Sequence, residues 1–559
     1  MLIDFAQEDI GPDLRAGICI VGAGAAGVTL ARGLAAQGLD ICLLESGGFD
    51  HDPVTQSLGV GENVGMPYYD LDDSRLRFFG GTTSIWGGRC APLDSLDFEA
   101  RNWIPHSGWP ITLEDLADGY RAAHRDLEIG DYEYGDLLWE ALATDPPPFD
   151  RDRFVTPFWR FDGVRERFSA RRAGDLLERP NVRVLIHANA VHLQADPNAE
   201  RLEHVEIASL GGRRAIVRAD IYVLACGGIE NARLLLASSD VESRGIGNRH
   251  DRVGRFFMEH AHGRLGRLSS NQAFDLWNRF RKRFPKGNSG GAGNPSNGVP
   301  IAPVLAPAPA LQRELGILNT AMTFKWQRDP GRGMPVVQRL YQNLKHQLEP
   351  TRKNRHLWHF YRGLATWYQR RLAIPITRGL AALPDRRLHV MIRAEQAPNP
   401  QSRVRLSHSR DALGLPRADL DWQFADQDKH TLRRLAETLD AEFKRLGLGR
   451  FDPEPWLYDG ELAWPVDPTV GNHPIGGYHH MGTTRMSEAP QAGVVDRNCA
   501  VHGYRNLYVA GSSVFATSGW ANPTLTILAL AHRLKDHLVS RMVAPPSRSN
   551  TTATNGNRP

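Results

Sequence analysis

The stretch that decides the fold is Ile18-Cys19-Ile20-Val21-Gly22-Ala23-Gly24-Ala25-Ala26-Gly27, near the start of the chain. Its first four residues form a short apolar run, as expected of a strand buried in a parallel sheet. A helical stretch follows and ends near Gly38, and a second apolar run, Ile41-Cys42-Leu43-Leu44, closes on Glu45. The sequence therefore predicts a strand–turn–helix–strand unit around a G-x-G-x-x-G fingerprint.

The fingerprint predicts a dinucleotide site. Gly22 permits a tight turn, Gly24 lets the backbone approach a pyrophosphate, and Gly27 lets helix and strand pack closely. The first helical residues, Ala25 and Ala26, are expected to hold the phosphates. The acid that closes the second strand, about twenty residues on, is placed to accept hydrogen bonds from a ribose diol. The motif alone leaves NAD and FAD both open.

A second informative region lies near the end of the chain. Tyr478-His479-His480-Met481-Gly482-Thr483-Thr484-Arg485-Met486 is followed by Ala521-Asn522-Pro523-Thr524-Leu525-Thr526. A histidine in a glycine-bounded loop can accept a proton near neutral pH. Asn522 has the pattern of a helix N-cap and Pro523 that of the first helical residue. A base and a helix N-terminus facing one pocket suit a reaction that removes a proton and accumulates negative charge.

Motifs along nearly the whole chain resemble the glucose–methanol–choline (GMC) flavoprotein oxidoreductases, most closely their pyranose-oxidase and sugar-dehydrogenase branch. Besides the fingerprint and the late region, the resemblance rests on Gly80-Gly81-Thr82-Thr83-Ser84-Ile85-Trp86-Gly87-Gly88 and Ala225-Cys226-Gly227-Gly228-Ile229-Glu230-Asn231-Ala232-Arg233. It implies FAD, oxidation of an alcohol to a carbonyl, and a catalytic pair formed by His479 and Asn522. The further cofactor contacts expected from it are Gly81, Thr82, Trp86, Gly87, Gly88, Val191, Cys226, Gly227, Gly511, Ser512, Asn522, Pro523 and Thr524.

The chain departs from the family pattern at two places. Several pyranose-oxidase-like members carry a flavin-linking histidine immediately before the tryptophan of the Gly80–Gly88 loop. Ile85 stands there and has no nucleophile, so FAD is expected to be held non-covalently. Many members also have an aspartate after the late strand Leu507-Tyr508-Val509-Ala510, where this chain has Gly511-Ser512-Ser513.

The expected reaction begins with His479 taking the hydroxyl proton while the carbon delivers hydride to the flavin. Asn522 would hold the same oxygen. His480 is the alternative base, disfavoured because adjacent side chains usually point to different sides. Three other functions stay open: a hydroxynitrile-type flavin lyase, a non-catalytic flavin-binding partner, and an NAD-dependent dehydrogenase. The electron acceptor, whether oxygen, quinone or cytochrome, is not fixed by these motifs.

Composition narrows the function classes further. The 67 Lys and Arg against 63 Asp and Glu give a net charge of +4, too mild to indicate nucleic acid. No 18-residue apolar run or secretory leader is visible, so a cytoplasmic and possibly membrane-peripheral protein is expected. Five cysteines without zinc-type spacing predict no disulfide framework. His260 and His262, two residues apart, could be metal ligands, but a structural pair is favoured and no metal is expected.

The α/β chain is expected to hold a discontinuous Rossmann-like domain and an α+β substrate domain with a mostly antiparallel sheet. The FAD-binding domain is assigned to residues 12–110, 181–264 and 464–545. The substrate domain is assigned to 111–180 and 265–463, with strands near 388–393 and 402–406 and a helix from Asp426 to Leu446. Residues 284–300 are interpreted as a mobile loop, and 546–559 as a disordered tail.

One segment differs from the balanced average of the chain. Residues 338–378 hold nine basic side chains and one acid, Glu349, with aromatic residues interleaved; the basic ones are Arg339, Lys345, Arg352, Lys353, Arg355, Arg362, Arg370, Arg371 and Arg378. Such a pattern suits docking on an anionic membrane or on an acidic acceptor protein. A solvated helical face with its aromatics in the core is the alternative. The aromatic residues that motivate the first interpretation are Trp358, Trp367 and Tyr368.

Overall fold

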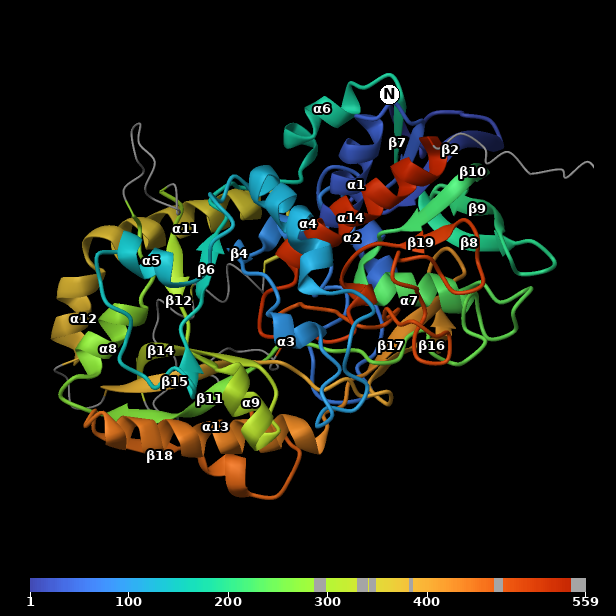
Figure 1. Ribbon diagram of the computed structural model, residues 1–559. Helices are drawn as coiled ribbons and strands as arrows, with labels where there is room; N and C mark the ends of the chain where they lie inside the picture. The colour runs from blue at the N-terminus through green and yellow to red at the C-terminus, as the bar shows by residue number, and fades with distance from the viewer. Residues whose placement is uncertain (286–297, 329–339, 341–347, 382–385, 467–475, 544–559) are drawn as a thin grey trace, which may run out of the picture.

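A largely parallel sheet forms the centre of one half of the molecule (Figure 1). The computed structural model describes residues 1–285, 298–328, 340, 348–381, 386–466 and 476–543. The sheet runs in the order β1 (Leu2–Asp4), β7 (Val182–Ile186), β3 (Ile41–Leu44), β2 (Asp13–Val21), β10 (Arg214–Leu224), β9 (Leu202–Ala208) and β8 (Asn189–Ala195). The strands from β1 to β10 are parallel, and β9 and β8 are antiparallel additions. The carboxyl end of β10 also pairs with β19 (Leu507–Val509), so segments from the start, middle and end of the chain meet there.

Helices from distant segments cover this sheet. α1 (Ala25–Ala35) packs against α14 (Thr524–Val543), and α14 packs against α4 (Leu113–Leu127). α7 (Gly227–Ala237) contacts β8 and the hairpin of β16 (Arg403–Arg410) and β17 (Pro416–Asp421). The apolar runs of β2 and β3 are fully buried between these layers, which is why they are hydrophobic without alternation.

The other half is built on a four-stranded antiparallel sheet. Its order is β14 (Thr320–Arg328), β15 (Arg386–Ala394), β11 (Ala261–Ser269) and β18 (Arg450–Pro453). α13 (Asp426–Arg445) packs on β18 and β11, while α8 (Ala273–Phe280) packs on β14 and α12 (Ala373–Ala381) on β15. Figure 1 shows α13 below this sheet, α8 and α12 at the outer edge of the same half, and α11 (Arg352–Arg371) along its top.

Short elements complete the description. They are α2 (Pro53–Gln56), α3 (Ser95–Phe98), α5 (Asp136–Ala141), α6 (Gly174–Leu177), α9 (Pro309–Leu315), β4 (Arg89–Cys90), β5 (Phe154–Val155), β6 (Phe158–Phe161), β12 (Ile301–Pro303), β13 (Ala306–Pro307) and the 3-10 turn η2 (Gly81–Ile85). Within the described ranges, no helix is both long and apolar enough to cross a bilayer.

The predicted α/β class is confirmed, and so are the strand–turn–helix–strand unit and the helix beginning at Asp426. Three placements differ from expectation. Leu2–Asp4 forms an edge strand before the expected start at residue 12, because it pairs with β7. The strand predicted near 402–406 packs with its hairpin partner on α7 instead of joining the antiparallel sheet. α4 packs on α14 of the nucleotide-binding half. Most of the 284–300 loop and the 546–559 tail lie outside the described residues.

Candidate active site

The glycine turn after β2 is closely packed at two positions and open at a third. An added Cβ at Gly22, whose φ is +105°, would lie 2.6 Å from the carbonyl oxygen of Ala225. A Cβ at Gly27 would lie 1.9 Å from the carbonyl oxygen of Gly22, whereas one at Gly24 would meet no atom within 4 Å. The close contacts hold α1 against the sheet, and the open space at Gly24 leaves room for a pyrophosphate beside the helix N-terminus.

Glu45, at the end of β3, faces the same space. Its carboxylate accepts hydrogen bonds from the backbone N–H of Ala23 at 2.9 Å and of Gly47 at 3.2 Å. Burial raises the pKa of Glu45, and the backbone donors oppose that rise. The side chain is thus fixed next to the glycine turn, with acceptor oxygens that fit a ribose diol.

One cavity joins most of the predicted cofactor residues. It is lined by Gly22, Gly24, Ala25, Ala26, Glu45, Gly81, Thr82, Val191, Cys226, Gly227, Gly511 and Ser512. Gly27 is not part of the wall but packs closely against Gly22, which is. Within the described part of the chain, the cavity wall does not include Trp86, Gly87, Gly88, Asn522, Pro523 or Thr524. The lining reaches from the glycine turn to the residues after the late strand β19, as a site for a dinucleotide such as FAD would require.

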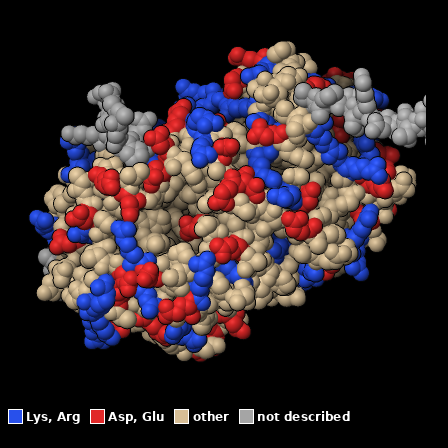
Figure 2. Space-filling view, viewed as in Figure 1, with Lys and Arg blue, Asp and Glu red and all other residues tan. Residues whose placement is uncertain are grey.

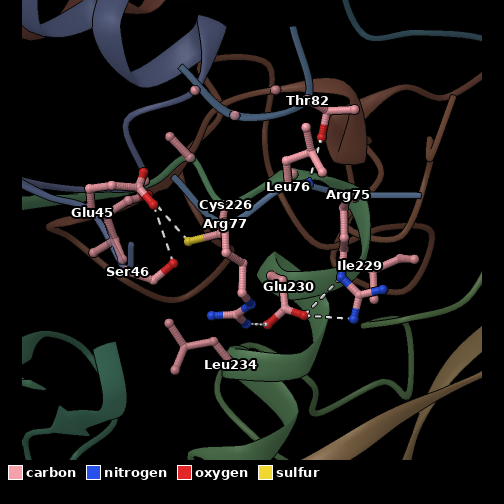
Figure 3. A pocket seen from close by; sticks show the side chains of 18 of the residues that line it. Glu45, Ser46, Arg75, Leu76, Arg77, Thr82, Cys226, Ile229, Glu230 and Leu234 are labelled. Carbon is pink, nitrogen blue, oxygen red and sulfur yellow. Dashed lines mark hydrogen bonds and ion pairs between the residues drawn. The ribbon is translucent and has the colours of Figure 1, made fainter. Parts of the chain in front are cut away.

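A cluster of arginines that the sequence analysis did not single out also lines this cavity (Figure 3). Arg75 and Arg77 each contact the Glu230 carboxylate, at 2.8 and 2.7 Å. Arg233 lies 2.6 Å from Asp411 and 3.3 Å from Glu230. Burial opposes ionisation of Glu230, but the three guanidinium groups hold its pKa well below the usual range. Within this cluster the three guanidinium groups outnumber the two carboxylates, so this part of the cavity wall suits an anionic ligand group.

The predicted catalytic pair is in direct contact. His479 Nε2 lies 3.1 Å from Asn522 Nδ2. On its other side, His479 Nδ1 lies 2.8 Å from Nδ1 of His260. The remaining ring nitrogen of His260, Nε2, lies 2.8 Å from the carbonyl oxygen of Gly519. Four groups from three chain segments therefore form one hydrogen-bonded row.

The polarity of this row fixes which ring nitrogen of His479 is basic. A carbonyl oxygen only accepts, so His260 Nε2 carries the hydrogen that faces Gly519. Neutral His260 then has a lone pair at Nδ1, which accepts from Nδ1–H of His479. His479 is left with an unprotonated Nε2, whose lone pair accepts a hydrogen bond from Asn522 Nδ2–H. A group that can take a proton is thereby presented at a defined atom.

Burial favours the neutral form of both rings. Burial lowers the pKa of His260 to about 4, although hydrogen bonds to backbone carbonyls oppose the shift. The pKa of His479 is held well below its usual value by burial and by the neighbouring His260 and Arg393. Both rings are neutral at neutral pH, as the tautomer assignment requires.

Glu259 positions the loop that carries His479. Its carboxylate accepts from the Tyr68 hydroxyl at 2.7 Å and from the backbone N–H groups of Gly477 at 2.9 Å, His479 at 2.7 Å and His260 at 2.6 Å. The side chain is completely buried, so each donor replaces a lost water contact. One carboxylate thus ties the His260 and His479 backbones together.

The prediction that Asn522 caps the last helix is wrong. The helix begins at Thr524, and the Asn522 side chain turns to His479 instead of to the helix N-terminus. Its Oδ1 is buried and has no hydrogen-bond partner among the described residues. Asn522 can therefore offer a ligand both an acceptor, Oδ1, and a donor, Nδ2–H.

The other two histidines near the site have different partners. His480 Nε2 lies 3.0 Å from the Tyr68 hydroxyl, and the ring lines the cofactor cavity. Arg393 contacts Nε2 of His262 at 2.8 Å. No group of three metal-binding side chains occurs among the described residues. The sequence suggested only a structural or metal-binding role for His260. Its place in the hydrogen-bonded row with His479 is visible only in the structure.

Comparison with known proteins shows what the chain is similar to. A family model described as GMC oxidoreductase matches residues 398–531, which include both His479 and Asn522. The 6'''-hydroxyparomomycin C oxidase of Streptomyces lividus is 24% identical, over 94% of this chain and 92% of its own length. The C-terminal part of the chain, with both candidate catalytic residues, thus matches the GMC oxidoreductase family. The paromamine 6'-oxidase of Streptomyces fradiae is 23% identical, over 96% of both chains.

A solved structure shares the fold of this chain. Pyridoxine 4-oxidase from Mesorbium loti superposes with a TM-score of 0.50 at 17% identity, over 93% of this chain and 99% of that one. The family match implies FAD as the cofactor, and it fits oxidation of a CH–OH group. The glycine cradle, Glu45 and the arginine cluster fit that cofactor.

Proposed function

We propose that this enzyme oxidises a CH–OH group of a sugar or glycoside, with His479 Nε2 as the base that takes the hydroxyl proton. The observation that carries the proposal is the polarised row from Gly519 through His260 to His479, which ends on an unprotonated nitrogen beside Asn522. The two aminoglycoside oxidases that align over nearly the whole chain support a sugar hydroxyl as the target. FAD, when bound, supplies the two-electron oxidant.

The residues of the row have distinct tasks in this proposal. His479 accepts the proton at Nε2 while Asn522 Nδ2 donates a hydrogen bond to the same substrate oxygen, which fixes its angle. His260 is a positioning residue, since it holds the Nδ1 hydrogen of His479 and touches no substrate. After proton transfer, the His479 imidazolium still donates from Nδ1 to His260. General-base assistance of this kind is worth about a hundred- to ten-thousand-fold in rate.

Non-covalent attachment of FAD is part of the same proposal. Ile85, at the end of η2, offers no nucleophile. Burial raises the pKa of the cavity thiol of Cys226 to about 12, so that side chain is protonated at neutral pH. His480, the ring nearest this cavity, is already bonded to Tyr68.

Anaerobic reduction of the bound flavin by a panel of sugars, glycosides and simple alcohols tests the function. Bleaching by a sugar or glycoside, far faster than by a simple alcohol, is the expected result. A flavin that no CH–OH donor reduces would contradict oxidation and favour the lyase alternative. Reoxidation by air or by a quinone, measured in the same cuvette, separates oxidase from dehydrogenase behaviour.

A further inference from the structure

The outer face of α11 exposes a continuous apolar stripe. Leu357, Phe360, Leu364 and Trp367 are 46%, 63%, 52% and 56% exposed. Their spacing of three, four and three residues places them on one side of a helix, over about 15 Å of its length. Ile374 and Ile376 of the adjoining α12 are also exposed, at 39% and 40%. Six exposed large apolar side chains within twenty residues form a patch, not scattered single residues.

The opposite face of α11 is firmly attached to the protein. Arg355 lies 2.7 Å from Asp50 and 2.6 Å from Glu166, and its guanidinium is nearly buried. Trp358 is only 5% exposed. The expectation that Trp358 is an interfacial aromatic is therefore wrong, because it lies on the inward face. Since the helix has a buried side of its own, the exposed stripe does not result from a missing core contact.

Basic residues flank the stripe. Lys353 precedes it and Arg371 follows it on the same side of the helix, and both are exposed. Neither forms an ion pair with any described residue. No Asp or Glu occurs from Pro350 to Pro384. Figure 2 shows basic and acidic side chains interspersed over the face in view, so an acid-free stretch of this length is a local feature. Arg339 and Lys345 of the predicted basic segment lie outside the described residues.

We infer that α11 lies in the interface of an anionic lipid bilayer, with the stripe inserted among the headgroups and Lys353 and Arg371 facing the lipid phosphates. Amphipathic helices bind in this way when a narrow apolar face is bordered by cations. A row of exposed apolar side chains on one helix face fits a deformable lipid interface, and the flanking cations complement anionic headgroups. This surface lies outside the substrate and cofactor machinery, so the inference does not depend on which alcohol is oxidised.

Co-sedimentation of the FAD-loaded enzyme with vesicles tests the inference. Vesicles of phosphatidylcholine with phosphatidylglycerol should pellet the protein, and added salt should weaken binding because it screens exposed charges over about 10 Å at 0.1 M. Replacing Phe360 and Trp367 together by Ser should lower the partition coefficient at least about tenfold, since each buries apolar area in lipid. Replacing Lys353 and Arg371 by Gln should lower binding to anionic vesicles and leave binding to pure phosphatidylcholine unchanged.

The matched control replaces two exposed leucines elsewhere, Leu137 and Leu210, by Ser. It should bind vesicles like the wild type, and all variants should keep substrate-driven flavin reduction. Wild-type protein that fails to pellet, or a Phe360/Trp367 variant that binds as well as the control, overturns the inference. If the stripe variant instead lowers the oligomeric mass without lipid, the surface joins two copies of the chain. If neither lipid nor mass responds but turnover with an acidic acceptor protein falls, the surface serves that acceptor.

Discussion

Replacement of His260 is the sharpest test of the polarised row. In His260→Phe, the Nδ1–H of His479 loses the acceptor that now lies 2.8 Å away. A buried donor without a partner costs about 1–3 kcal/mol. His479 avoids that cost by shifting its ring hydrogen from Nδ1 to Nε2. There the hydrogen finds an acceptor, because Oδ1 of Asn522 has no partner among the described residues and faces Nε2 once the amide rotates. The lone pair that takes the substrate proton is then lost.

The size of the effect follows from the free-energy cost of the unpaired Nδ1–H donor. About 1–3 kcal/mol corresponds to roughly a 5- to 150-fold drop in the population with a free Nε2, and hence in the rate of flavin reduction. His260→Gln should recover most of the rate, because its Oε1 can accept from His479 while its Nε2 donates to Gly519. The assay is stopped-flow bleaching of the flavin without oxygen, at saturating substrate and with FAD content measured for each variant.

Two results would refute the reasoning about this row. One is a His260→Phe enzyme that carries full FAD and reduces it at the wild-type rate. The other is a Gln variant as slow as the Phe variant while both are folded and FAD-loaded, which would mean that ring shape matters and hydrogen-bond polarity does not.

Three further outcomes are expected. His479→Ala should retain FAD and slow flavin reduction by about a hundred-fold or more, the usual value of a general base, whereas His480→Ala should cost less; a larger loss at His480 would reverse the assignment. Acid precipitation should release yellow FAD into the supernatant, because Ile85 cannot form a histidyl bond; colour in the pellet would contradict this. Burial lowers the pKa of His260 to about 4 and of His480 to about 3, against about 6.5 in the unfolded chain. The unfolded state therefore binds more protons than the folded state below pH 6.5. Urea unfolding should show the free energy of unfolding falling from pH 6.5 towards 4, by up to about 3 kcal/mol for His260 alone. A constant free energy of unfolding over that range would contradict the burial of neutral rings.

The sequence predicted those parts of the protein that are marked by a characteristic spacing of nearby residues. The glycine turn, Glu45 and the helix from Asp426 depend on short-range patterns that one chain displays. The arginine cluster around Glu230 could not be found in this way, because Arg75 and Arg77 reach it across more than 150 residues. The same holds for His260, whose partner lies 219 residues away. Asn522 was given a capping role because local preference favours it, and the contact with His479 prevailed over that preference.

The shape of the cofactor cavity has a consequence for how the enzyme is made. Gly22 and Ser512 line the same cavity, and 490 residues of chain separate them (512 − 22). At a translation rate of about 5–20 residues per second, a ribosome needs roughly 25–100 s to pass from one to the other. During that time the glycine turn has no opposite wall, and β10 lacks the neighbour that β19 provides along Tyr222–Leu224. A nascent chain that has not yet reached Ser512 therefore cannot enclose FAD, and closure of the cavity around the cofactor must wait until that residue has left the ribosome.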